Sequence, residues 1–352
     1  MRLTAVTPVA IVLVTSSAAT ARAEWGETMN RALAAYKSKD FKTAEQLALA
    51  SFEQAEGFAP DDARLIQTHV LLADVYRETR QWAAAAEQLR VALDRHKGRG
   101  SQESQEASNL HNKLGIVCTQ MKDYDCAMPA FEAALALKRQ KYKENSASIA
   151  SVITNLAELC RRKGDLARAE SLHLEAIADK ERELGPTHAS LVISLNDLAL
   201  VLRDLKRFDD AVPPLERALG LARQNAAPGA RADLGTTLHN LADVQSSRAK
   251  QVDALKLFEE ALTLRRAELA SHHPQLSDTL NAYGNLLVVA GRGDEGLAML
   301  DEAIAIRREE FGKSDSRTLT VMNNKVIALV RLGRAPDAEA LKAEIATLKA
   351  RP

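Results

Sequence analysis

Small and apolar residues recur along most of the chain with a period of about 42 residues, as in helical repeat proteins. Pairs of Leu or Tyr followed by Ala or Gly lie in helical patterns at almost equal intervals: Leu72-Ala73, Leu114-Gly115, Leu156-Ala157, Leu198-Ala199, Leu241-Ala242 and Tyr283-Gly284. Two further small residues follow each pair at fixed distances: Ala85, Ala127, Ala169, Ala211, Ala254 and Gly296, then Ala92, Ala134, Ala176, Ala218, Ala261 and Ala303. A fixed period of this length predicts a repeat protein built from helices.

Each repeat is predicted to be a helical hairpin. Helix axes approach to about 8–10 Å where the facing side chains are small, so the Ala and Gly positions mark the line of contact. Within repeats, turns are indicated at Lys163-Gly164-Asp165-Leu166 and Val289-Ala290-Gly291-Arg292, where glycine suits a left-handed helix C-cap. Between repeats stand helix breakers: Ala59-Pro60-Asp61-Asp62, Gly185-Pro186-Thr187-His188, Pro228-Gly229 and His273-Pro274. We expect the hairpins to stack, each covering the apolar stripe of its neighbour.

The repeat resembles the tetratricopeptide repeat in its longer version. The resemblance is carried by the Leu-Gly or Leu-Ala pair, a turn, and an aromatic or apolar residue that precedes Ala: Trp82, Tyr124, Leu166 and Phe208. Three segments resemble the repeats of kinesin light chains and their bacterial relatives: Leu184-Gly185-Pro186-Thr187-His188, Thr154-Asn155-Leu156-Ala157 and His239-Asn240-Leu241-Ala242. The resemblance covers about residues 60–340 and implies an all-α, right-handed superhelical solenoid of stacked antiparallel helix hairpins.

The N-terminus predicts an exported protein. Met1-Arg2-Leu3 is a charged start, residues 5–14 are apolar, and Ala21-Arg22-Ala23 is an A-x-A cleavage site, which together indicate a cleavable signal peptide at residues 1–23. The apolar run is shorter than the roughly twenty residues that a membrane-spanning helix needs, although an uncleaved N-terminal anchor is the alternative. We expect cleavage after Ala23 and a periplasmic or secreted protein without membrane insertion after cleavage.

The remaining chain divides into three parts. Residues 24–58 are a degenerate N-terminal hairpin with its turn at Lys39-Asp40-Phe41, residues 59–334 are the tandem repeats, and residues 335–352 are a C-terminal capping helix. The composition, 46% apolar, 27% charged and 4% aromatic, agrees with a helical protein. With 47 basic and 47 acidic residues there is no overall field that favours nucleic acid, so local surfaces select the partner.

The family resemblance implies a partner-binding surface on the concave face, which the first helix of each hairpin lines. One row of that face is predicted to hold Asn112, Thr154, Asn196, His239, Asn281 and Asn323, and a row seven residues further on Arg77, Thr119, Arg161 and Arg203. Amides can bind a peptide backbone and arginines can pair with carboxylates. Asp74, Glu158 and Asp243 lie between the rows and would limit which charges fit. The predicted partner is a protein or peptide, extended and partly acidic; the alternative is that these are ordinary solvated positions.

Catalytic chemistry is not indicated. The G-x-G-x-x-G match at Gly291–Gly296 lies between two predicted helices, whereas a dinucleotide site requires a preceding strand. No H-E-x-x-H, G-x-S-x-G or phosphate-loop motif is present. We therefore predict no catalytic residues, no metal site, no cofactor and no enzymatic activity.

Three cysteines leave two alternatives. Cys118 and Cys160 occupy equivalent positions one repeat apart, so their Cα atoms are expected to exceed the roughly 7 Å limit for a disulfide. Cys118 and Cys126 flank one predicted turn and are either bridged, with Cys160 left as a thiol, or all three are reduced.

Two functions remain in competition on the sequence. The first is a non-catalytic adaptor or scaffold that binds a protein or peptide in the concave groove. The second is a structural subunit of an envelope assembly, which associates with copies of itself through its terminal repeats. An enzyme would need a domain for which the repeats leave no room.

Overall fold

The computed structural model describes residues 9–55, 58–98, 105–141, 147–225 and 230–350. These residues form helices and no strands. The first eight helices are α1 (Val9–Lys37), α2 (Phe41–Gln54), α3 (Ala63–Glu78), α4 (Trp82–Gly98), α5 (Gln105–Gln120), α6 (Tyr124–Lys141), α7 (Ala147–Lys163) and α8 (Leu166–Leu184). The others are α9 (Leu191–Asp204), α10 (Phe208–Gln224), α11 (Ala230–Ser247), α12 (Gln251–Glu268), α13 (Pro274–Val289), α14 (Gly293–Phe311), α15 (Ser316–Arg331) and α16 (Ala335–Ala350).

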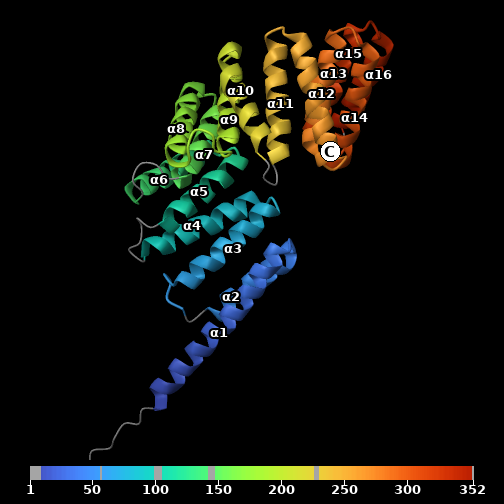
Figure 1. The fold of residues 1–352 in the computed structure, drawn as a ribbon. Coiled ribbons are helices and arrows are strands. Elements are labelled where there is room, and N and C mark those ends of the chain that lie inside the picture. Colours follow the sequence, from blue (N-terminus) through green and yellow to red (C-terminus); the bar gives the residue numbers. More distant parts are fainter. Residues whose placement is uncertain (1–8, 56–57, 99–104, 142–146, 226–229, 351–352) are drawn as a thin grey trace, which may run out of the picture. The chain divides into compact units, whose positions relative to one another are not determined.

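The helices are stacked as antiparallel hairpins within two compact units. Met1–Asp165 form the first unit, with α1 to α7, and Leu166–Pro352 the second, with α8 to α16. Inside each unit every helix packs against the next one in the chain (Figure 1). First helices of successive hairpins also touch, as α5 does with α7 and α13 with α15. This arrangement confirms the predicted all-α fold of stacked hairpins.

The repeated small residues lie where the helices meet. The predicted Ala positions of the second helices, from Ala85 to Ala303, are fully buried, and Gly296 is buried as well. Gly284 and Gly296 face each other so closely that a Cβ atom on Gly284 would lie 2.8 Å from the Gly296 carbonyl oxygen. The period in the sequence therefore follows the contact line between the two helices of a hairpin.

Every turn inside a hairpin has one residue with a left-handed backbone. Gly164, Gly291 and Gly333 have φ values of +84°, +85° and +73°. At the same place the other hairpins have Lys39, Arg80, Lys122, Lys206 and Ala249, with φ between +60° and +64°. The Gly291 turn is closed by bonds from Arg292 N to Leu287 O and from Gly291 N to Val288 O, the two bonds of a Schellman motif. Glycine is thus the least strained choice for this turn, but the packed hairpin also holds other residues in it.

The described residues begin in α1 and end in α16. The predicted cleavage site after Ala23 lies within α1, whereas residues 1–8 of the predicted signal peptide lie outside the described residues. Trp25 of α1 has a buried side chain, and its indole Nε1 donates a hydrogen bond to Thr68 Oγ1 (3.2 Å). At the other end, α16 buries Ala338 and Ile345. None of the helices searched in the described part of the chain combines the length and the apolar character needed to cross a membrane.

Candidate partner-binding site

The second unit contains a groove lined by the first helices of its last three hairpins. A hollow of about 460 Å³ lies between α11, α12, α13 and α15, and a second hollow of about 220 Å³ adjoins it between α13 and α15. Both are lined by Asn285, Val289 and Arg331. Of the predicted site residues, Asn281 lines the larger hollow. Asp243, which was expected to restrict the charge of a ligand, lies in the same wall.

Asn285 and Arg331 line both hollows with side chains that have no partner in the described part of the chain. Among the described residues, Asn285 and Arg331 make no side-chain hydrogen bond or ion pair with the protein. Apolar side chains lie beside them: Val289 is 46% exposed and Ile327 is 65% exposed. An unpaired guanidinium next to exposed apolar side chains can bind a ligand carboxylate that has an apolar residue near it.

The first predicted row joins neighbouring hairpins to each other. The side-chain oxygens of Asn112, Asn196 and Asn281 accept hydrogen bonds from amides of the next hairpin, at 2.9–3.0 Å; the donors are Asn155, Asn240 and Asn324. Thr154 bonds its own helix at Ala150 O. The row is therefore in large part an amide ladder between adjacent first helices, a role that the sequence analysis did not foresee.

Asn196 shows this most clearly. Its side chain is 5% exposed, and its amide nitrogen donates to Val192 O (2.9 Å) and Thr237 Oγ1 (2.8 Å). Its oxygen accepts from Asn240 Nδ2 (2.9 Å). With these bonds made inside the protein, Asn196 connects α9 to α11 and presents almost no polar surface to a ligand.

The second predicted row is occupied by internal ion pairs. Arg77 pairs with Glu78, and Arg161 pairs through two bonds with Glu158. Arg203 donates to Asp243 Oδ2 at 2.9 Å, across two hairpins. Thr119 is buried and bonds Gly115 O of its own helix. A ligand carboxylate would have to compete with these carboxylates, whereas Arg331 presents no such obstacle.

His239 is held neutral by its surroundings. Its ring packs edge-on against Phe258, with 5.6 Å between the ring centroids, and Nδ1 lies 3.4 Å from Thr279 Oγ1. Burial, together with the positive charges of Arg265 and Arg203, lowers the pKa of His239 to about 3. His239 therefore contributes an uncharged ring to this part of the fold at neutral pH.

The first unit has a groove of different character. A hollow of about 500 Å³ is lined by residues of α1, α3, α4 and α5, including the apolar Leu33, Ile66 and Val70. At its edge Lys113 Nζ and Asp74 Oδ2 form an ion pair (2.5 Å). Since its charged groups are already paired, this hollow offers apolar surface and no unpaired cation of the kind seen at Arg331.

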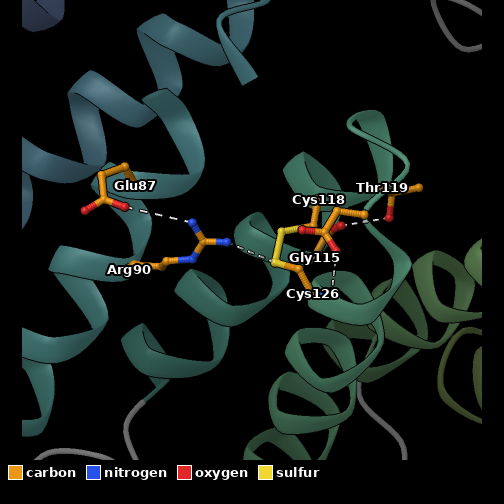
Figure 2. Close-up of a disulfide and its surroundings, with 7 residues drawn as sticks. Glu87, Arg90, Gly115, Cys118, Thr119 and Cys126 are labelled. Atoms are coloured by element: carbon orange, nitrogen blue, oxygen red, sulfur yellow. Dashed lines mark hydrogen bonds and ion pairs between the residues drawn. A yellow bond between two sulfur atoms is a disulfide. The ribbon is translucent and has the colours of Figure 1, made fainter. Parts of the chain in front are cut away.

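Of the two cysteine alternatives, the structure has the bridged one. Cys118 at the end of α5 and Cys126 in α6 form a disulfide, with 5.8 Å between their Cα atoms (Figure 2). Cys160 is buried. Figure 2 also shows Arg90 of α4 extending toward the bridge, where its Nη2 lies 3.6 Å from Cys126 Sγ. The disulfide closes the turn of the α5–α6 hairpin. Among the described residues no group of three or more His, Cys, Asp or Glu side chains could hold a metal ion.

The groove residues Asn285, Val289, Ile327 and Arg331 were not predicted from the sequence, although their spacing from the first row places them on one helix face. Asn285 and Ile327 stand four residues after the first-row positions 281 and 323, and Val289 and Arg331 stand eight residues after them. Steps of four and eight remain on one face of a helix, as the step of seven does. Spacing alone does not say which of the two faces the groove.

Family models agree with this architecture. A model described as tetratricopeptide repeat matches residues 105–181, 148–224 and 275–349, and a second model with the same description matches residues 234–275. The chain belongs to the tetratricopeptide repeat family. Two relatives are the protein kinesin light chain-related 2 of Arabidopsis thaliana and the mitochondrial tetratricopeptide repeat protein 19 of Homo sapiens.

The first relative is 22% identical over 214 residues, which is 60% of this chain and 32% of that protein. The second is 31% identical over 110 residues, 30% of this chain and 28% of that protein. The chain thus spans about a third or less of the length of these relatives. The likeness confirms repeats of the kinesin-light-chain type, and tetratricopeptide and kinesin-light-chain-like families are typically non-catalytic.

Solved structures of the same fold support this assignment. BtubC (BKLC) from P. vanneervenii is 25% identical, with a TM-score of 0.57 over 64% of this chain and 91% of that chain. The apo quorum sensor NprR from B. thuringiensis has a TM-score of 0.68 at 14% identity and covers 92% of this chain and 86% of its own. The Rap protein complexed with Competence and Sporulation Factor has a TM-score of 0.52 at 13% identity, over 93% and 97% of the two chains. The last two show the fold alone, and the fold as a whole supports a role in protein interaction.

Proposed function

We propose that this protein is a non-catalytic adaptor that binds an extended, partly acidic segment of a partner protein in the groove of its second unit. A carboxylate of the segment would pair with Arg331, the Asn285 amide would bond the segment's backbone, and an apolar side chain would contact Val289 and Ile327. The unpaired Arg331 carries the proposal, because the three arginines of the second predicted row already pair with carboxylates of the chain.

The chemistry of the groove favours this class of ligand. Arg pairs with a carboxylate through two parallel hydrogen bonds, and a neutral amide can satisfy both the donor and the acceptor of a peptide group. The Rap protein, a neighbour in fold, is itself complexed with another factor, which is consistent with a binding role for such stacked hairpins. Asp243 in the same wall pairs with Arg203, so its charge is balanced inside the protein, whereas the charge of Arg331 is not.

Arg331→Ala is expected to weaken binding of an acidic peptide by about ten-fold or more, because a charge-assisted hydrogen bond contributes about 1.5–3 kcal/mol. The probe is an acidic peptide selected on the purified protein from a displayed library of unstructured peptides, with affinity measured by fluorescence anisotropy. The matched control is Arg334→Ala, since Arg334 lies outside the groove and pairs with Asp337. Equal affinities of wild type and Arg331→Ala for every selected peptide would refute the groove.

We also propose that the protein is exported and cleaved after Ala23. Arg22, Ala23 and Glu24 are exposed in α1, where a peptidase could reach the bond after Ala23, and the buried Trp25 lies on the side that cleavage would retain. The Cys118–Cys126 disulfide fits an oxidising compartment. Mass spectrometry of the protein from its producing cells is expected to give Glu24 as the first residue; a chain that still begins at Met1 would contradict cleavage.

A further inference from the structure

The amide bonds between hairpins follow one rule. The side-chain oxygen of a first-row Asn accepts a hydrogen bond from the next hairpin. The donor is the residue directly before the repeated Leu-Ala pair of that hairpin or before its equivalent, as Asn240 before Leu241-Ala242 donates to Asn196. The last first-row residue, Asn323, is already in the accepting arrangement. Its Nδ2 donates to Leu319 O at 2.8 Å, as Asn196 Nδ2 does to Val192 O, but its oxygen accepts no hydrogen bond within the described part of the chain.

The first helix has the matching donor. The fully buried Ala32 and Ala44 of the first hairpin correspond to Ala73 and Ala85 of the second hairpin. Arg31-Ala32 therefore takes the place of the Leu-Ala pair, and Asn30 occupies the donor position of α1. Asn30 is exposed and makes no side-chain hydrogen bond to a described residue. Among the described residues, α15 thus holds an unused amide acceptor and α1 an unused amide donor of the same ladder.

A basic residue of α16 and an acidic residue of α1 occupy repeat positions that are in contact at other junctions between hairpins. Basic residues near the ends of α8 and α12 extend to the first helix of the next hairpin: Lys180 Nζ bonds Ser194 Oγ (2.6 Å), and Arg265 bonds Thr279 Oγ1. Arg307, the equivalent residue of α14, bonds Ser277 Oγ of its own hairpin instead (2.9 Å). The equivalent residue of α16 is Lys349, two repeats after Arg265. Ser194 and Thr279 each stand four residues before the first residue of the repeated pair, Leu198 or Tyr283. In α1 the residue four before Arg31 is Glu27.

Lys349 and Glu27 are both exposed, and neither has an ion-pair partner among the described residues. An apolar side chain completes the C-terminal face. Val330 is 56% exposed, whereas Val288, one repeat earlier, is 5% exposed in a hairpin that is followed by another. The C-terminal face therefore keeps the apolar, amide and charged features of a junction between hairpins.

We infer that this protein associates head to tail with a second copy of itself, with the α1–α2 hairpin of one copy docking on the α15–α16 hairpin of the next. Asn30 Nδ2 of one copy donates to Asn323 Oδ1 of the other, Glu27 pairs with Lys349, and the docked hairpin covers Val330. Such an interface is heterologous, so each copy retains one free head and one free tail, and association continues into longer assemblies or a ring. It uses other residues than the peptide groove and does not depend on the proposed function.

Sedimentation velocity of the protein purified from its producing cells is expected to show an average mass that rises with concentration. Glu27→Lys and Lys349→Glu each place like charges at the junction and are expected to weaken association about ten-fold. An equimolar mixture of the two variants, and the double variant, are expected to regain wild-type association, because every junction then joins opposite charges. Asn323→Ala removes the acceptor and is expected to weaken association about five-fold.

Lys256→Glu is the matched control, because Lys256 is an exposed lysine of the interior helix α12 and its change is the same in charge. It is expected to leave association unchanged. Circular dichroism of each variant checks that its helices are intact. A single mass at all concentrations, equal effects of Lys256→Glu and Lys349→Glu, or a mixture that stays as dissociated as its components would overturn the head-to-tail junction.

Discussion

Replacing Asn196 by alanine is expected to lower the free energy of unfolding by about 2–3 kcal/mol, since alanine removes two donated bonds and one accepted bond from a position that is 5% exposed. It also leaves the Asn240 amide without its acceptor in a buried setting, and a buried polar group without a partner costs about 1–3 kcal/mol. Because two of the three lost bonds join α9 to α11, the change mainly loosens a contact between two hairpins.

Urea unfolding followed by circular dichroism measures this change. The matched control is Asn285→Ala, since Asn285 is half-buried in the groove and makes no side-chain hydrogen bond to the described residues. We expect Asn285→Ala to change stability by less than about 0.5 kcal/mol and to weaken the peptide instead. Similar stability of the two alanine variants would show that the Asn196 bonds contribute nothing net to the fold.

Acidification is expected to destabilise the protein through His239. The pKa of this ring is about 3 in the folded protein and 6.5 in an unfolded chain, so between these values the unfolded state binds more protons. The stabilisation is complete above pH 6.5 and is lost progressively as the pH falls toward 3. At about 1.4 kcal/mol per pH unit, His239 alone is expected to cost about 2 kcal/mol at pH 5.

His239→Asn isolates this contribution, because asparagine is the natural residue at the same position of other hairpins, such as Asn196 and Asn281. Burial also lowers the pKa of His69 and His111, so the wild-type protein has other acid-sensitive groups. The quantity to compare is the fall in unfolding free energy between pH 7.5 and pH 5 in wild type and in His239→Asn. We expect a smaller fall in the variant; the same fall in both would mean that His239 is protonated in the folded protein.

The two proposed interactions place different demands on the same hairpins. The groove uses Asn285 and Arg331, which line the hollows that the last three hairpins form. The head-to-tail junction uses one face of the α1–α2 hairpin and one face of the α15–α16 hairpin. In the hairpins between them, the equivalent faces are covered by neighbouring hairpins. Arg331→Ala should therefore leave self-association unchanged, and Lys349→Glu should leave peptide affinity unchanged, so the two experiments separate an adaptor from an assembling subunit.

The architecture could be read from the sequence because it is periodic and local. Small residues such as Ala169 and Ala211 recur at positions where two helices touch, and the structure buries both completely. The turns at Gly164 and Gly291 were also predictable, because a helix that ends in a left-handed residue favours glycine there. Each of these features depends only on residues of one hairpin, so a single sequence contains the needed information.

The direction in which each polar side chain of a first helix points was decided by the tertiary structure. Consecutive residues of a helix differ by about 100° around its axis, so small differences in how adjacent hairpins pack decide whether a side chain meets its neighbour or the groove. Asn196 and Asn281 share one position in the repeat, yet the first is buried and the second lines a hollow. The Cys118–Cys126 bridge was likewise left open by the sequence, because spacing across a turn permits a disulfide and only the distance between the two helices determines whether it forms.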